Sequence, residues 1–230
     1  IGGALERARD GEEFRFTVKG GVALELRLLT KARATKDLDI IVNHAEADLL
    51  QELDCAIAEG YEGLGFRRKA GVRALENGAV RMEVAVDYRG GTWGTVQVDL
   101  ARFESGRTEV ELIHGMPLGQ FGLVGPGVLH CLSLRYHVAH KIHGMTRSST
   151  PDWQNDRERD LVDLLLLEEL VTDYVSLKEA CVEVFGSRAQ HNWPPTTAFP
   201  QEWSEPVMAL LRELEVPVAS YEMACEQVSA

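Results

Sequence analysis

Residues 14–42 restrict the possible folds of this chain more than any other stretch, because they predict a complete unit of strand, turn, helix and strand. Residues 14–18 alternate and are rich in strand formers, and they lead directly into Lys19-Gly20-Gly21, a turn that glycine makes easily. Residues 22–29 carry apolar side chains at helical spacing, and residues 37–42 form a second, largely apolar strand. The front of the chain is therefore expected to be mixed α/β.

The rest of the front half continues this mixture. A surface helix is expected at Glu46–Glu59, closed by Gly60. Two strands of a hairpin around Gly90-Gly91 are expected at Arg81–Val86 and Thr95–Phe103. From Pro126 onward the apolar spacing is helical. The expected helices are Val128–Met145, Asp156–Leu170, Ser176–Phe185 and Glu205–Leu214.

These patterns predict an α+β fold, in which a mixed sheet with helices is followed by a mostly α-helical part. The change of pattern near Gly125-Pro126-Gly127 places a domain boundary between residues 1–125 and residues 126–230. A single fold in which the later helices pack on the sheet is the alternative.

Composition excludes several classes of protein. With 45% hydrophobic and 26% charged residues among 230, the chain is too apolar for a disordered protein. The net charge of -12 means that any polynucleotide partner must bind a local basic patch. The four cysteines form no Cys-x-x-Cys pair, and no stretch approaches the roughly 20 apolar residues that cross a bilayer. We therefore expect a cytoplasmic protein with no membrane partner.

Two carboxylates are the first candidates for chemistry. Because residues two apart on a strand share a face, Asp37 and Asp39 project together while Leu38 and Ile40 point to the core. Like charges this close are unfavourable unless a cation lies between them, and hard oxygen ligands suit Mg²⁺. The alternative is an edge strand with a solvated face.

The glycine turn upstream strengthens the case for Mg²⁺. A strand-to-helix turn at Gly20-Gly21 exposes backbone N–H groups at a positive helix end, where phosphates bind. Asp99 is the preferred third carboxylate for a two-metal site, because it lies between apolar neighbours in a predicted strand. Glu83 and Asp87 on the partner strand are rivals.

Two separated motifs resemble the AbiEii family, the nucleotidyltransferase toxins of type IV toxin-antitoxin systems, to which the MenT toxins are related. The first is Val18-Lys19-Gly20-Gly21-Val22-Ala23-Leu24 followed by Arg33-Ala34-Thr35-Lys36-Asp37-Leu38-Asp39-Ile40. The second is His140-Lys141-Ile142-His143-Gly144 followed by Arg157-Glu158-Arg159-Asp160-Leu161-Val162-Asp163-Leu164. The resemblance spans residues 14–170 and implies a nucleotidyltransferase-like catalytic domain at 1–125, to which a helical domain at 126–230 adds a lysine and an aspartate.

The resemblance also implies a reaction and roles for the residues. A nucleoside monophosphate would pass from a nucleoside triphosphate to an acceptor, with the 3′ end of tRNA as the expected one, in a protein that acts as the toxin beside a cognate antitoxin. Lys141 would reach the phosphates as a mobile point charge, and an acidic residue on the next helix would orient it. Asp163 is preferred for this role, because Asp160 can pair with Arg157 instead.

The expected site therefore has three overlapping sets of residues. The catalytic residues would be Asp37, Asp39, Asp99, Lys141 and Asp163, and the ligands of Mg²⁺ would be Asp37, Asp39 and Asp99. The nucleotide would be bound by Lys19, Gly20, Gly21, Lys141, Arg159 and Asp160.

Several features leave the interpretation open. Val22 stands where many family members carry a hydroxyl, which predicts weaker activity or an altered nucleotide preference. A small-molecule nucleotidyltransferase of the antibiotic-modifying kind would share the first motif, and a catalytically silent binding protein would keep the fold. Basic residues that offer a local groove for RNA are Arg67-Arg68-Lys69 and the set Arg135, Lys141, Arg147, Arg157 and Arg159. A zinc site at His137, His140 and His143 is disfavoured, because steps of three rotate around a helix.

Overall fold

The computed structural model describes residues 1–44, 48–75, 78–102, 109–119 and 122–229. These residues form two compact units. The first unit holds the described residues of 1–29 and 34–132, and the second holds 30–33 and 133–229. A short piece of chain between two strands of the first unit thus belongs to the second.

The first unit is built on a mixed sheet that has eight strands within the described residues, in the order β5-β7-β8-β4-β3-β10-β9, with β6 beside β7. Strand β4 at its centre pairs antiparallel with β3 and parallel with β8. The strands are β3 (Phe16–Lys19), β4 (Asp37–Val42), β5 (Leu64–Arg68), β6 (Arg73–Ala74), β7 (Val80–Tyr88), β8 (Gly91–Arg102), β9 (Val110–His114) and β10 (Val128–Leu132). A separate two-stranded ribbon joins β1 (Arg9–Asp10) to β2 (Glu13–Phe14).

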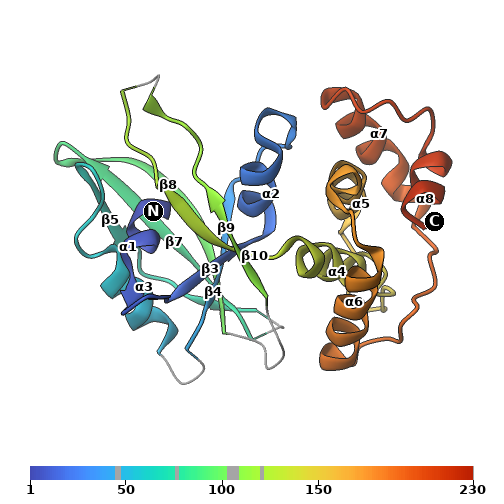
Figure 1. The fold of residues 1–230 in the computed structure, drawn as a ribbon, viewed down its shortest axis with the longest axis horizontal. Helices are drawn as coiled ribbons and strands as arrows, with labels where there is room; N and C mark the ends of the chain where they lie inside the picture. The colour runs from blue at the N-terminus through green and yellow to red at the C-terminus, as the bar shows by residue number, and fades with distance from the viewer. Residues whose placement is uncertain (45–47, 76–77, 103–108, 120–121, 230) are drawn as a thin grey trace. The chain divides into compact units, whose positions relative to one another are not determined.

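The helices of this unit, within the part of the chain that the structure describes, are α1 (Gly2–Arg7), α2 (Gly20–Leu28) and α3 (Leu49–Ile57). In Figure 1, α1 and α3 lie against the sheet, and the two helices also contact each other. The apolar side of β4, with Leu38 and Ile40, packs into one core cluster with Leu53 of α3. The residues that alternate with them, Asp37 and Asp39, stay partly exposed on the opposite face of the strand.

The second unit is helical. Its helices are α4 (Leu134–Met145), α5 (Glu158–Leu167), α6 (Tyr174–Arg188), α7 (Ser204–Glu213) and α8 (Tyr221–Ser229), with short 3₁₀ turns at Leu29–Lys31, Glu168–Leu170 and Gln201–Trp203. Helix α4 packs against α5 and α6, and α5 packs against α7 and α8 (Figure 1). Leu161, Leu167 and Phe185 are among the buried apolar residues. Within the described residues, no helix is both long and apolar enough to span a membrane.

The predicted α+β fold with a helical second part is confirmed, and one predicted helix is wrong at its start. Residues 128–132 form strand β10, and the helix begins only at Leu134. An apolar run of this length suits a strand or a helix equally, and pairing with β3 and β9 decides the outcome. The contacts divide the two units between residues 132 and 133, beyond the boundary predicted at 125.

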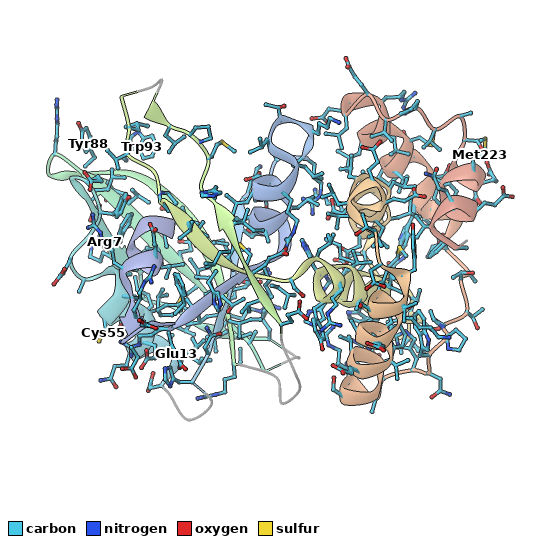
Figure 2. All side chains as sticks on the ribbon, viewed as in Figure 1. Arg7, Glu13, Cys55, Tyr88, Trp93 and Met223 are labelled. Atoms are coloured by element: carbon cyan, nitrogen blue, oxygen red, sulfur yellow. The ribbon has the colours of Figure 1, made fainter. Side chains whose placement is uncertain are left out.

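The hairpin predicted around Gly90-Gly91 is present as β7 and β8, although Phe103 lies outside the described residues. Its register shifts once, between Val86 and Asp87, because Val86 pairs with Gly94 while Asp87 pairs with Thr92. Trp93 is the extra residue of this bulge, and 77% of its surface is exposed. Figure 2 labels Trp93 and Tyr88 at this end of the hairpin.

Candidate functional site

A row of charged residues crosses four neighbouring strands of the sheet. Lys19 pairs with Asp39, Asp39 with Asp99, and Asp99 with Arg81, from β3 through β4 and β8 to β7. Residues in register across a sheet point to the same face. The row therefore presents two cations with two carboxylates between them on the face away from the core cluster.

The glycine turn lies directly against this row. Gly20 has a φ of +63°, and a Cβ there would lie 2.0 Å from Oδ2 of Asp39. A Cβ on Gly21 would lie 2.5 Å from Oγ1 of Thr35. Since no side chain except hydrogen fits in either place, the two glycines allow the start of α2 to approach the second carboxylate.

The start of α2 also has features that favour an anion. Lys19 is the N-cap residue in extended conformation, its side chain makes no capping hydrogen bond, and the first turn holds no acidic residue. Backbone N–H groups at such a helix end attract negative charge. The phosphate cradle predicted at Gly20-Gly21 thus has a suitable local structure, with Val22 adding no hydroxyl.

The two outer carboxylates of the site have side-chain partners. Asp37 Oδ1 accepts a hydrogen bond of 2.8 Å from Nε2 of Gln97. Asp99 accepts two hydrogen bonds from Arg81, at 2.8 Å from Nε and 2.7 Å from Nη2. The hydrogen bond with Asp99 raises the pKa of Arg81, and the charges of Asp37 and Asp39 act in the same direction. Arg81 is thus hydrogen-bonded to Asp99, and the charges of Asp37 and Asp39 add to its stabilisation.

The donor set suits a magnesium ion at Asp37 and Asp39. Mg²⁺ is commonly held by one or two protein carboxylates, with water and substrate phosphates as its other ligands. Among the residues that the structure describes, no three His, Cys, Asp or Glu side chains are gathered to hold a metal ion. Asp99, expected as a third ligand, faces Arg81 with both oxygens, so its participation requires that Arg81 move.

The other acidic residues considered for this site are paired with bases. Glu83 binds Lys69 at 3.1 Å, and Asp87 lies 3.6 Å from Arg67. Arg68, the remaining member of the basic triplet, binds Asp54 at 2.6 Å. The triplet expected to attract RNA is therefore largely neutralised by neighbouring carboxylates.

A second cluster of predicted residues forms within the helical unit. Lys141 of α4 donates to Asp160 Oδ1 at 2.8 Å and to Asp163 Oδ2 at 2.6 Å, both on α5. Lys141 and both carboxylates are buried. Burial alone would lower the pKa of Lys141, but Asp160 and Asp163 outweigh it and raise the pKa. Lys141 is a buried cation that both candidate acids hold.

The same cluster extends to two arginines. Arg157 lies 3.4 Å from Asp160, the local pairing that the sequence suggested. Arg33 binds Asp163 through two hydrogen bonds, 2.7 Å from Nε and 2.8 Å from Nη2. Asp163 has no exposed surface and is shared between Arg33 and Lys141.

Arg159 lies in a different environment from Lys141. It lines a pocket between α5 and α7 together with Glu158 and Glu213, and the rest of the lining is apolar. Of the three histidines for which a zinc site was disfavoured, His137 and His143 are buried in the helical unit. His143 packs against Phe185 and His191, with ring centroids 4.9 Å and 4.7 Å away.

Two arginines of these clusters, Arg81 and Arg33, were not predicted as site residues from the sequence. The signal for Arg81 was its place on the strand paired with Asp99, but the register depends on the bulge at Trp93. The signal for Arg33 was its position four residues before Asp37 inside the first motif. Neither position identifies the partner, which in each case is distant in sequence.

Comparison with known proteins agrees with the motifs. The AbiEii family, described as nucleotidyl transferase AbiEii toxin of a type IV TA system, matches residues 3–220. A solved structure of MenT4, a nucleotidyltransferase toxin from Mycobacterium tuberculosis H37Rv, is similar in fold, with a TM-score of 0.59 and 18% identity. That match covers 98% of this chain and 87% of the MenT4 chain. The search of curated proteins found no match.

Two further solved structures align at lower similarity. JHP933 from Helicobacter pylori is 15% identical with a TM-score of 0.45, over 99% of this chain and 89% of its own. An antigenic nucleotidyltransferase-like protein from Paracoccidioides brasiliensis is 14% identical with a TM-score of 0.44, over 76% and 80%. The family match over almost the whole length is the decisive comparison, and the chain is a nucleotidyltransferase that belongs to the AbiEii family of type IV toxins.

Proposed function

We propose that this protein transfers a nucleoside monophosphate from a nucleoside triphosphate to an acceptor hydroxyl in a reaction that needs Mg²⁺. The observation that carries the proposal is the carboxylate pair Asp37 and Asp39 beside a glycine turn that a Cβ would block. Phosphate-binding N–H groups and metal-binding oxygens thereby meet at one end of α2.

In this reaction the acceptor oxygen forms a bond to the α-phosphorus while the bond from that phosphorus to the bridging oxygen breaks. Pyrophosphate leaves with the bond's electron pair. Bound Mg²⁺ would neutralise the triphosphate and favour the in-line arrangement. Asp37 and Asp39 are the residues that would hold the ion, and the N–H groups at Gly20-Gly21 would bind phosphate oxygens.

The remaining predicted residues have supporting parts. Asp99 accepts the proton of the acceptor hydroxyl once Arg81 releases one of its oxygens. Lys141 contributes positive charge to the phosphates. The two aspartates occupy two of the three N–H donors of its ammonium, so one donor is left for a phosphate oxygen. Lys19 and Arg159 are the further nucleotide contacts proposed from the motifs.

The acceptor we propose is the 3′ end of tRNA, with a cognate antitoxin as the protein partner. The support is family membership, since the matching family is described as the nucleotidyl transferase toxin of a type IV toxin-antitoxin system. Antibiotic-type transfer to a small molecule is the second candidate, since it needs the same carboxylates and glycine turn.

The test is incubation of the purified protein with each labelled nucleoside triphosphate, Mg²⁺ and total tRNA, followed by gel separation of the RNA. We expect label on RNA from one triphosphate. Asp37→Asn should lower transfer at least about a hundredfold, as expected when a metal ligand for phosphoryl transfer is lost. Asp10→Asn, at an exposed carboxylate of the same unit, is the matched control.

The outcomes separate the candidates. Label on RNA that disappears in Asp37→Asn supports the proposal and identifies the nucleotide. Pyrophosphate release with a small hydroxylated acceptor but no labelled RNA would favour the second candidate. Equal transfer by Asp37→Asn and the native protein would refute the assigned site.

A further inference from the structure

Arg33 stands out among the charged residues that the proposed reaction leaves without a role. It lies in the piece of chain, residues 30–33, that belongs to the helical unit although it connects α2 to β4. Its side chain is 12% exposed and makes a bidentate ion pair with the fully buried Asp163. A planar guanidinium forms this fork with a carboxylate, and a lysine does not.

The pair matters because Asp163 has a second partner. Its Oδ2 accepts from Lys141 at 2.6 Å and from Arg33 at 2.8 Å. The Lys141 ammonium also donates to Asp160. Taken with the two carboxylates alone, Lys141 would be part of a group whose net charge is negative, and such a group repels a polyphosphate.

Arg33 removes that net negative charge. The five side chains joined by these ion pairs carry three positive charges, on Arg33, Lys141 and Arg157, and two negative charges, on Asp160 and Asp163. Arg157 is 56% exposed, so solvent screens it most. The buried part of the cluster is neutral with Arg33 and negative without it.

We propose that Arg33 is a positioning residue for nucleotide binding, which neutralises Asp163 while Arg157 offsets Asp160, so that the group around Lys141 presents no net negative charge to phosphates. This proposal rests on the proposed function, because it takes Lys141 as a phosphate contact. Arg33 acts through Asp163 and Lys141, and it needs no contact with the nucleotide.

The test uses the full chain and compares the affinity of four proteins for inorganic tripolyphosphate and for each nucleoside triphosphate, with Mg²⁺ present. The native cluster has a net charge of +1, Arg33→Gln has 0, Arg33→Lys restores +1, and the double variant Arg33→Gln with Asp163→Asn also has +1. Thermal unfolding of each protein identifies variants that fail to fold.

We expect Arg33→Gln to weaken tripolyphosphate binding by about tenfold, the scale of one charge several ångströms away in a partly screened site. Arg33→Lys and the double variant should each bind tripolyphosphate more tightly than Arg33→Gln does, although each loses the bidentate pair. A purely structural role predicts the opposite order, in which the double variant binds no better than Arg33→Gln.

The results distinguish this proposal from the proposed function. Native affinity in Arg33→Gln, or no recovery in the double variant, would overturn the role of Arg33 while transfer by the native protein still stands. Charge-dependent binding without transfer would support Arg33 and refute the reaction. No polyphosphate binding by the native protein would overturn both.

Discussion

At the scale of single residues, the site depends on side chains that are absent as much as on those present. Gly20 combines a positive φ with a position where a Cβ would overlap Asp39, whereas Gly90 has a positive φ of +83° with no atom near its missing Cβ. A substitution at Gly90 therefore tests backbone strain alone, whereas the same substitution at Gly20 tests backbone strain together with the steric overlap at Asp39.

Gly20→Ala should destabilise the protein more than Gly90→Ala does. Gly90→Ala is expected to lower the free energy of unfolding by about 1 kcal/mol from the left-handed φ alone. Gly20→Ala adds the displacement of Asp39, so we expect a loss of about 2–4 kcal/mol together with a large loss of transfer. Denaturant titration and the transfer assay measure both. Equal effects of the two substitutions would show that the approach of Asp39 to the turn is unimportant.

A titrating residue gives a second prediction at this scale. Burial, with a smaller contribution from Arg188, lowers the pKa of His143 from 6.5 to about 3. The unfolded chain therefore takes up a proton below pH 6.5 that the folded protein refuses until about pH 3, so this residue makes stability fall as the pH falls between those values. His143→Phe should flatten the dependence of the unfolding midpoint on pH in that range.

The comparison for His143→Phe is His44→Gln, at an exposed histidine with no such burial. Its unfolding midpoint should follow the native pH dependence. If His143→Phe also follows the native curve from pH 6.5 downward, the buried imidazole is not the source of acid sensitivity.

At the scale of elements, the sequence located the strands better than it located their register. Residues 37–42 were predicted with the bounds that the structure gives to β4, because a period of two and apolar flanks are strong signals. The pairing of Asp99 with Arg81 was beyond such reasoning, since continuing the pairing of Tyr88 with Gly91 without a bulge would bring Val98 opposite Arg81. A one-residue shift moves every side chain to the other face.

In the candidate site, too, local features were predictable from the sequence and contacts between elements were not. The carboxylates and the glycines were named from residue type and spacing, whereas Lys141 was named from the resemblance to the AbiEii motifs. Arg33 and Arg81 were missed because their partners, Asp163 and Asp99, come from other elements. Spacing along the chain predicts local geometry, whereas ion pairs between elements depend on tertiary packing.

Removing Trp93 tests the interpretation of the bulge. Without it, Thr92 and Gly94 become neighbours and can keep their partners Asp87 and Val86, so Arg81 still faces Asp99. We expect the deletion to leave the fold and the carboxylate row in place, with an unfolding free energy within about 1 kcal/mol of native. Inserting a glycine after Trp93 enlarges the bulge and should be more damaging. Denaturant titration would contradict this view if the deletion were the more harmful change.

At the scale of the whole molecule, the two units are not two consecutive pieces of sequence. Residues 30–33 lie between two strand-bearing segments of the first unit but belong to the helical unit, where Arg33 binds Asp163. A fragment of residues 133–229 would keep Asp163 buried beside Lys141 and would lose its second cation.

This arrangement predicts that Asp163→Asn has opposite effects on stability in the full chain and in the fragment. In the full chain, Asp163→Asn leaves Arg33 without its buried carboxylate and Lys141 with Asp160 alone, and it should cost about 3 kcal/mol or more. In the fragment 133–229, the same substitution removes the excess negative charge and should raise the unfolding midpoint. Unfolding followed by circular dichroism measures both. A loss of similar size in both contexts would show that Arg33 is not the partner that Asp163 requires.

The crossing of residues 30–33 also limits how such a protein can be recombined. A single genetic crossover near residue 132 would join the helices of one protein to residues 30–33 of another. Arg33 and its partner Asp163 would then come from different proteins. Exchange of whole helical units between relatives therefore keeps this pair when the short segment travels with the helices, or when both relatives carry an arginine and an aspartate at these two positions. Inheritance of the chain as one block is the simplest way to keep the pair together.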